Sequence, residues 1–170
     1  RGWTVKRVKP GCEKGWRRVV PSPEPLRIVE ADVITALLAQ GVVVVASGGG
    51  GIPVAGDNGS GLAGVHAAID KDKAGCTPAR EVGEDGLLIL TDVEAVALGY
   101  GTPDQRYLDE ITVADAERFL AEGHFLSGSM GPKVEACARF VRWGGKRAWI
   151  GSLDRAADIL AGTSGTRIVA

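Results

Sequence analysis

The segment VVVVASGGGG, residues 42–51, joins four consecutive valines to four consecutive glycines. An unbroken run of β-branched residues is typical of a strand that is covered on both faces of a parallel sheet. Glycine gives up more backbone entropy on folding than other residues and adds no side chain to a core. Two explanations of the glycine run remain open: a flexible turn, or a loop whose N–H groups approach an anion such as phosphate. The segment therefore predicts a sheet strand at Val42–Ala46, followed by a turn or a ligand-binding loop.

Helical and strand patterns alternate along the rest of the chain. Helices are expected to begin near Ala31, Thr112, Pro132 and Ser152, and glycines at 41, 123 and 144 would end the first three. Strands are expected at Val42–Ala46, Leu87–Leu90, Arg147–Ile150 and Arg167–Val169. This alternation predicts an α/β fold, a three-layer sandwich with a mainly parallel central sheet and helices on both faces.

Two of these helices have more specific signatures. Thr112 followed by Asp115 is a capping-box variant at a helix start. After Pro132, which suits a first helical turn, apolar residues recur at helical spacing. The inner face of that helix is predicted to consist of Val134, Cys137, Phe140 and Val141.

Composition limits the classes of function. The chain has 170 residues, 45% of them hydrophobic and 24% charged, with a net charge of −1, which is typical of one globular domain. A net charge near zero provides no basic surface of the kind that binds nucleic acid. No apolar run reaches the ~20 residues that span a bilayer. The three cysteines are far apart and form no CxxC, so we expect reduced thiols in a cytoplasmic protein and no metal site.

One motif is a chance match. Residues 59–64, GSGLAG, fit the dinucleotide fingerprint GxGxxG. That fingerprint must follow its strand directly, whereas the predicted strand Val42–Ala46 ends about a dozen residues earlier. We therefore do not expect a dinucleotide site there.

The charged segments IDKDK, residues 69–73, and GSMGPK, residues 128–133, are candidates for chemistry. Alternating charges of this kind are commonly a solvated helix start. Phosphoryl transfer, however, needs cations to neutralise the migrating group and a carboxylate to hold them. Lys71, Lys133 and Asp72 would supply this set if the fold brings them together, near the strand ends at Gly48–Gly51 and Thr91–Asp92 where α/β sheets bind ligands.

At these segments the sequence resembles a known family. GWRRVVPSPEP, SGGGGIPV, AAIDKDKAG, LILTDVEAV, EGHF, GSMGPKVEA and GTRIV occur in that order. Together they resemble carbamate kinase, of the amino acid kinase superfamily, over essentially the whole chain. The resemblance implies reversible phosphoryl transfer between ATP and carbamate, giving ADP and carbamoyl phosphate, with Mg²⁺ and without a P-loop.

The resemblance also implies roles for individual residues, none of them a metal ligand. Lys71 and Lys133 would contact the phosphates as catalytic residues, and Asp72 would organise them. Gly48, Gly49, Gly50 and Gly51 would form the loop on the phosphate and substrate side. The nucleotide-binding residues would be Thr91, Asp92, Val93, Gly128, Met130, Pro132 and Lys133.

By the same resemblance, residues 1–30 belong to a protruding substrate-side subdomain and residues 31–170 to the C-terminal nucleotide-binding domain. Carbamate kinases are about twice as long as this chain. We therefore expect the N-terminal phosphoryl-acceptor domain, with its KxGGNA loop, to be absent here, as the first residue, Arg1, also hints. His66 stands where the family tends to have glutamate, and no role is assigned to it.

A further departure concerns the helix after Asp72. Gly75 and Pro78 occur where the family has alanine and leucine, and a proline inside a helix costs ~3 kcal/mol. We therefore expect this helix to start late or to be broken.

Three functions stay open. The chain is the nucleotide-binding half of a carbamate kinase, completed by a missing N-terminal half or a complementing chain; or it is a non-catalytic nucleotide-binding module with an assembly or regulatory role. The third is another member of the superfamily, acting on an amino acid that forms an acylphosphate, and the motifs GSMGPK and WRRVVPSP argue against it. We expect a homodimer, with nucleotide and carbamate or carbamoyl phosphate as ligands and with neither nucleic acid nor membrane as partner.

Overall fold

The fold is seen in a computed structural model that describes residues 3–7, 15–57, 61–125 and 129–170. Its central sheet has four strands in the order β5-β9-β10-β8. Strand β5 pairs in parallel with β9, β9 runs antiparallel to β10, and β10 is parallel to β8. The sheet is therefore mixed and mostly parallel, as expected. Its strands are Gly86–Thr91 (β5), Glu110–Thr112 (β8), Arg147–Ser152 (β9) and Thr166–Val169 (β10).

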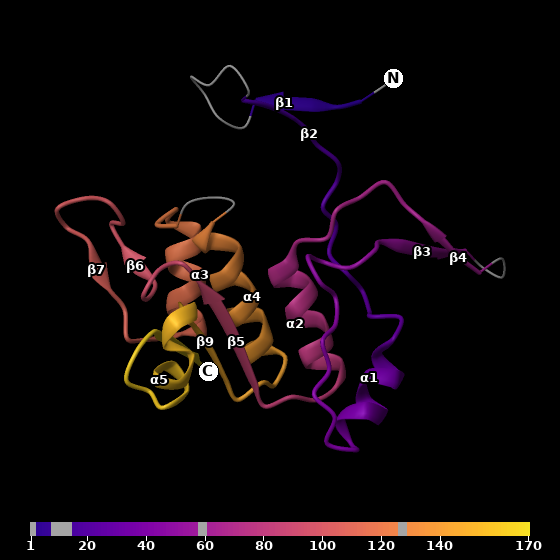
Figure 1. Ribbon diagram of the computed structural model, residues 1–170. Helices are drawn as coiled ribbons and strands as arrows, with labels where there is room; N and C mark the ends of the chain where they lie inside the picture. Colours follow the sequence, from indigo (N-terminus) through magenta and orange to yellow (C-terminus); the bar gives the residue numbers. More distant parts are fainter. Residues whose placement is uncertain (1–2, 8–14, 58–60, 126–128) are drawn as a thin grey trace.

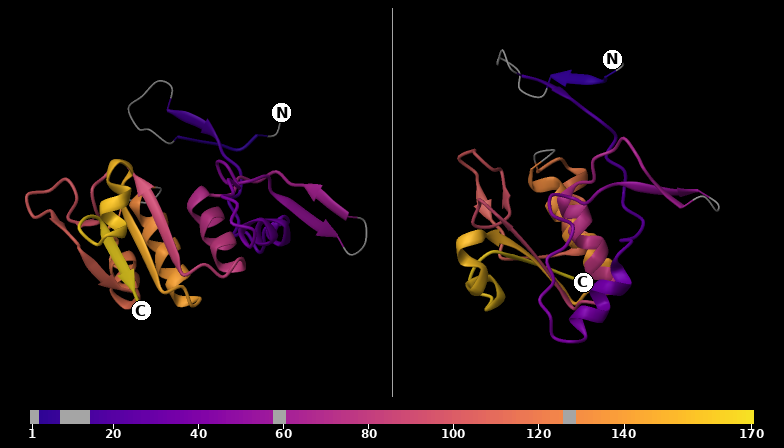
Figure 2. Two further views of the ribbon diagram at one scale, coloured as in Figure 1. Left: turned by 60° about the horizontal axis from the view of Figure 1, so that its bottom comes forward. Right: turned by 45° about the vertical axis from the view of Figure 1, so that its right-hand side comes forward.

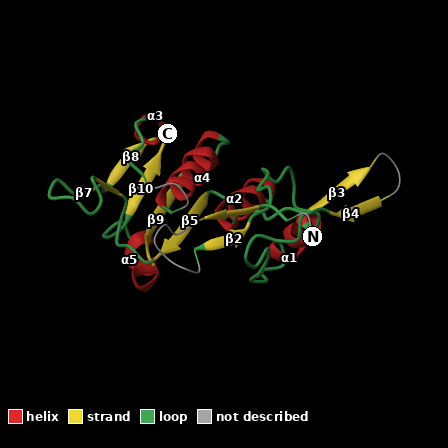
Figure 3. Cartoon of the chain, turned by 90° about the horizontal axis from the view of Figure 1, so that it is seen from above, coloured by secondary structure: helices red, strands yellow, loops and turns green. Residues whose placement is uncertain are grey.

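Helices lie on both faces of this sheet (Figure 3). On one face are α3 and α4, with α2 beside α4, and on the other is the short α5 behind a 3₁₀ turn. Ser152 caps that turn, since its Oγ accepts a hydrogen bond from the Asp154 N–H, as the sequence suggests. These elements are α2 (Lys71–Glu81), α3 (Val113–Ala121), α4 (Met130–Arg142), the turn Leu153–Arg155 and α5 (Ala156–Leu160).

The core lies between α4 and the sheet. The predicted inner face of α4 is confirmed, because all four of its apolar side chains are buried. They pack against Ile150 of β9 and Ile168 of β10, which are also fully buried. None of the described helices is long and apolar enough to cross a membrane.

The capping box at Thr112 is confirmed. Its hydroxyl accepts a hydrogen bond from the Asp115 N–H at 3.1 Å, and the Asp115 carboxylate accepts one from the Thr112 N–H at 3.4 Å. The Thr112 hydroxyl also donates a hydrogen bond to Asp115 Oδ2 at 2.9 Å, and this bond, together with the weaker contribution of the Thr112 N–H, holds the pKa of Asp115 below its ordinary value. Helix α3 thus starts where the sequence predicts.

The predicted strand at Val42–Ala46 is wrong. Helix α1 (Ala31–Leu38) precedes this run as expected, but the run itself belongs to no strand and most of it is exposed. A strand requires a neighbour to which its peptide groups can hydrogen-bond. The described part of the chain brings no such neighbour to the run, so the apolar pattern alone does not produce a strand.

The expectation of a late or broken helix after Asp72 is also wrong. Helix α2 is continuous from Lys71 to Glu81 and passes through Pro78. A proline there gives up the backbone hydrogen bond to Ala74 and costs ~3 kcal/mol or more. Packing of α2 along α4 and β5 stabilises the helix in spite of that loss.

Two β-hairpins project from the body of the molecule (Figures 1 and 2). One is formed by β1 (Val5–Arg7) and β2 (Trp16–Arg18), and the other by β3 (Val54–Asp57) and β4 (Gly61–Gly64). A third, small antiparallel pair is β6 (Ala97–Leu98) with β7 (Arg106–Tyr107). The described part of the GxGxxG match is thus a hairpin strand and not a turn into a helix.

Candidate active site

The two charged segments singled out in the sequence meet at the first turns of α2 and α4. Lys133 Nζ donates a hydrogen bond to Asp72 Oδ2 at 2.8 Å, and both side chains are buried. Lys71 Nζ lies 3.6 Å from the same oxygen, but its side chain is 62% exposed. The predicted convergence of Lys71, Asp72 and Lys133 is confirmed.

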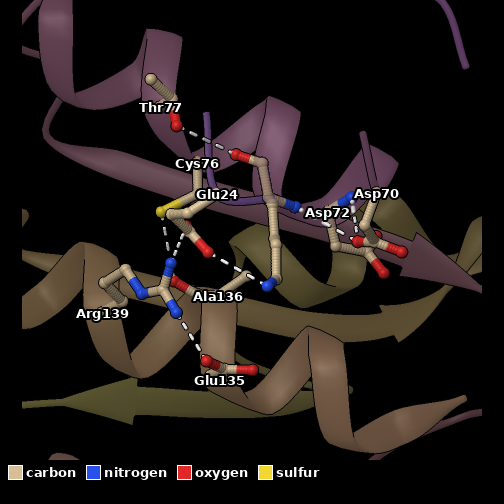
Figure 4. A network of polar contacts seen from close by, with 9 residues as sticks. Glu24, Asp70, Asp72, Cys76, Thr77, Glu135, Ala136 and Arg139 are labelled. Carbon is tan, nitrogen blue, oxygen red and sulfur yellow. Dashed lines mark hydrogen bonds and ion pairs between the residues drawn. The ribbon is translucent and has the colours of Figure 1, made fainter. Parts of the chain in front are cut away.

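Asp70 fixes the start of α2. Its Oδ1 accepts hydrogen bonds from the N–H groups of Asp72, at 2.9 Å, and Lys73, at 3.3 Å (Figure 4). A capping carboxylate satisfies N–H groups that would lack a partner in the first turn. This cap holds the Asp72 backbone in place, so that its side chain can reach Lys133 on the neighbouring helix.

A cavity of about 120 Å³ opens beside Lys133. It lies where β5 ends and α4 begins, and it has a polar wall and an aromatic wall. Its lining includes most of the predicted nucleotide-binding residues, namely Thr91, Asp92, Val93, Met130 and Lys133. Pro132 is not among the residues that line it, and Gly128 lies outside the described residues.

The aromatic wall consists of residues that the sequence reasoning did not assign to a site: Tyr100, His124 and Phe125. The His124 ring contacts Phe119 edge to face. Its Nε2 also lies 3.0 Å from Glu122. Tyr100 follows the glycine after β6, and no spacing pattern connects it with Lys133. Only the three-dimensional fold could have revealed it.

The glycine loop Gly48–Gly51 lies beside the same site but not at a strand end. Three of its N–H groups are already used within the turn: Gly50 and Gly51 donate to Ser47 O, and Gly48 donates to Ala46 O. Gly50 has φ +136°, and a Cβ there would lie 2.1 Å from the Ile69 carbonyl oxygen. Glycine is required at this position because the loop packs directly against the backbone that leads into α2.

A second network ties the N-terminal segment to both helices (Figure 4). Glu24 pairs with Lys73 of α2 at 3.0 Å and with Arg139 of α4. Arg139 also pairs with Glu135 at 2.5 Å. Through Glu24, the segment that follows the β1-β2 hairpin is held against the helices that position Asp72 and Lys133.

Two thiols lie one helical turn beyond the ion pair, at Cys76 on α2 and Cys137 on α4. Both are buried and free. Burial raises the pKa of Cys76 to about 11 and holds the pKa of Cys137 well above its ordinary value. Because the thiolate is the reactive form, neither side chain is suited to nucleophilic chemistry.

A larger cavity, of about 610 Å³, lies on the α5 side of the sheet. It is lined by Glu94, Tyr107, Trp149 and Arg167, among others, and by none of the predicted site residues. Size alone therefore does not identify the site. The smaller cavity is the candidate, because it is lined by the buried Lys133, whose ammonium group pairs with Asp72.

No metal cluster accompanies the site: within the described ranges no three His, Cys, Asp or Glu residues are placed to hold an ion together. Asp72 Oδ2 is already shared by two lysines. The arrangement concentrates positive charge at the N-terminal ends of two helices, which themselves favour anions. A group with several negative oxygens, such as a polyphosphate, matches it.

Comparisons with known proteins identify the family of the chain. The model of the amino acid kinase family matches residues 5–152. The chain is 54% identical over 169 residues to the carbamate kinase of Thermococcus kodakarensis, covering 99% of this chain and 52% of the relative. It is 45% identical over 168 residues to the carbamate kinase-like protein YqeA of Escherichia coli, covering 98% of this chain and 53% of that protein.

Among solved structures, carbamate kinase from Giardia lamblia bound to AMP-PNP superposes with a TM-score of 0.90 at 43% identity. The match covers 99% of this chain and 52% of that one. The chain thus spans about half the length of the curated relatives that it matches.

Proposed function

Since this chain belongs to the amino acid kinase family and is a carbamate kinase homologue, we propose that it supplies the ATP- and ADP-binding half of a carbamate kinase. The reaction would be reversible phosphoryl transfer between ATP and carbamate, giving ADP and carbamoyl phosphate. The observation that carries the proposal is the cluster of Lys71, Asp72 and Lys133 beside the cavity at the end of β5. A homologue that binds AMP-PNP supports it.

In this proposal the two lysines differ in role because they differ in exposure. Lys71 is largely exposed and shares Asp72 at a longer distance, so it is free to turn towards a phosphate. Lys133 is buried and held by Asp72, which fixes its ammonium group before any ligand arrives. Charge that is positioned in advance stabilises a migrating phosphoryl group without reorganisation cost.

The cavity would hold the nucleoside part of the ligand. Tyr100 and Phe125 of its aromatic wall offer flat apolar surface to a base, while Thr91 and Asp92 offer polar atoms. Lys133 belongs both to this cavity and to the ion pair, so base and phosphates would occupy one continuous site.

Mg²⁺ would enter with the nucleotide. The described residues provide no cluster of carboxylates for it, and Mg²⁺ is commonly held by substrate phosphates with only one or two protein carboxylates. Asp92, which is exposed at the rim of the cavity, is the residue that fits such a contact. The ion would neutralise charge on the phosphate oxygens when it is bound.

The second candidate function is a nucleotide-binding module without catalysis, which the same cavity and lysine cluster would also serve. An assay of ATP formation from carbamoyl phosphate and ADP distinguishes the two. We expect negligible turnover by the chain alone and measurable turnover when it is co-expressed with the part of the Thermococcus kodakarensis enzyme outside the 169 matched residues. A completed complex that binds ADP but never forms ATP would favour the module.

A further inference from the structure

The larger cavity lies on the face of the sheet that α4 does not cover. Trp149 of β9 and Arg167 of β10 are directly paired across the two strands. Because the next residue on each strand packs against α4, these two side chains point to the opposite face and line the cavity. The volume of about 610 Å³ is sufficient for a small organic molecule. Of the described residues, only Ala95 lines both cavities, so this cavity is separate from the candidate active site.

The lining of this cavity carries negative charge that no neighbouring cation balances. Arg167 is the cation of the described lining, and its guanidinium is already paired with Glu110, to which its Nε donates at 2.6 Å. Glu94, in the loop after β5, and Asp109, just before β8, line the same cavity. Neither carboxylate forms an ion pair with any residue that the structure describes. Two carboxylates therefore face the cavity without a positive partner.

Two aromatic side chains add flat surface to the same cavity, at Tyr107 of β7 and Trp149 of β9. The Trp149 ring already attracts one cation, because the Arg147 guanidinium lies 5.4 Å from its centroid. The electron-rich faces of aromatic rings attract cations, and planar guanidinium groups also stack on them. Carboxylates and aromatic rings together therefore match a positively charged ligand with a flat portion.

Ser164, in the connection between α5 and β10, is an independent sign of a ligand. Its Oγ is buried, its residue lines the cavity, and this oxygen has no hydrogen-bond partner among the described residues. Buried hydroxyl groups are almost always hydrogen-bonded, because a buried polar atom without a partner costs free energy. An N–H group of a bound cation would satisfy this oxygen.

We propose that the cavity between α5 and the sheet is a second ligand site, for a small organic cation. The ligand is an amidinium, guanidinium or amine attached to a flat or apolar portion. Its charged group pairs with Glu94 and Asp109 and donates to Ser164 Oγ, while its flat portion lies against the aromatic side chains. The inference is independent of the proposed function, because none of Lys71, Asp72 and Lys133 lines this cavity.

The test is an NMR titration of the 170-residue chain with benzamidine, a flat aromatic amidinium. We expect the amide resonances of residues 162–165 to shift saturably and those of residues 129–133 to stay unchanged. Benzamide and benzoate have nearly the same shape as benzamidine but are neutral and negative. Benzamide should bind about tenfold more weakly, because hydrogen bonds between charged groups are the stronger ones, and benzoate should not bind.

Variants identify the carboxylates that select the cation. Glu94→Gln and Asp109→Asn keep the size of each side chain and should each weaken benzamidine binding about three- to fivefold, the effect of one exposed ion pair. The matched control is Asp104→Asn, which removes the same charge from an exposed residue of the β6-β7 connection outside the lining. It should leave the affinity unchanged.

Ser164→Ala separates a role in binding from a role in the fold. It should weaken benzamidine binding about threefold, the effect of one hydrogen bond, without lowering the midpoint of thermal unfolding, because the hydroxyl has no partner in the described chain. A variant that unfolds at lower temperature but binds benzamidine normally would show that this hydroxyl serves the fold and not a ligand.

Three further outcomes would overturn the proposal: equal affinity for benzamidine and benzamide, shifts centred on residues 129–133, or no saturable binding at millimolar benzamidine by the folded chain. ADP binding, measured separately, distinguishes these failures from failure of the proposed function. A chain that binds ADP but not benzamidine contradicts only this inference. A chain that binds benzamidine but not ADP contradicts only the proposed function.

Discussion

Lys133 Nζ lies 2.8 Å from Asp72 Oδ2 although the two residues are 61 positions apart and both side chains are about nine-tenths buried. The contact joins the first turn of α4 to the first turn of α2. Burying two charges costs several kcal/mol of desolvation for each, and their attraction offsets that cost only when the geometry is good. Because such a pair adds little net stability, we attribute it to function: Asp72 holds the Lys133 ammonium group in position for a ligand.

Replacing one partner should therefore destabilise the fold, whereas replacing both should not. Asp72→Ala leaves a buried ammonium with no close anion, and we expect the free energy of unfolding to fall by about 3–5 kcal/mol. The double variant Asp72→Leu with Lys133→Met fills the same space with apolar atoms and should recover most of that loss. Urea denaturation of the three proteins measures this. A double variant as unstable as Asp72→Ala would contradict the account of the pair.

Lys71 should show the opposite behaviour, with an effect on binding and none on stability. Its side chain is mostly exposed, so Lys71→Ala should change the free energy of unfolding by less than about 0.5 kcal/mol. Loss of its charge near the phosphates should nevertheless weaken ADP binding by about 1.5–3 kcal/mol. Lys146→Ala, in the connection between α4 and β9, is the control, since Lys146 pairs only with exposed Asp85 among the described residues. Equal losses of affinity in the two variants would count against the site.

The strands of the sheet and the helices around it were predictable because patterns of neighbouring residues determine them. Apolar runs gave β5, β9 and β10, helical spacing gave the buried face of α4, and Thr112 with Asp115 gave the start of α3. The convergence of Lys71, Asp72 and Lys133 followed from the resemblance to carbamate kinases. Spacing alone could not show it, because it depends on how α2 packs against α4.

The failures share a different cause, since each depends on contacts far away in the sequence. Val42–Ala46 has the composition of a strand, but composition does not provide a neighbouring strand, and none of the described residues pairs with this run. Pro78 lowers the local propensity for helix, yet α2 is continuous because it packs against α4. Tyr100 reaches the cavity only through the β6-β7 turn. Each result is set by tertiary structure, which overrides local propensity.

The capping box of Thr112 and Asp115 predicts that the stability of the fold depends on pH. The pKa of Asp115 is lowered in the folded chain, mainly by the hydrogen bond from the Thr112 side chain. Its contribution to stability is therefore complete above the ordinary carboxyl value of 3.8 and is lost as the pH falls through the lowered value. Asp115→Asn should be less stable than wild type at neutral pH, and the difference should shrink below pH 3.8. A difference that stays constant down to full protonation would show that this carboxylate is not held by the cap.

The buried thiols should be unreactive in the folded chain. With the pKa of Cys76 at about 11 and that of Cys137 also raised, almost no thiolate is present at neutral pH. Iodoacetamide followed by peptide mass spectrometry should find both residues unmodified in buffer and modified in urea. Rapid labelling of Cys137 in the native chain would mean that α2 and α4 separate far more often than their packing suggests.

The central claim is that this chain carries the nucleotide site, and calorimetric titration of ADP with Mg²⁺ into the isolated 170-residue chain tests it most directly. We predict saturable 1:1 binding, weakened at least tenfold by Lys133→Ala and unchanged by Lys146→Ala. Absence of any binding at millimolar ADP, in a chain whose unfolding transition shows it to be folded, would contradict the claim.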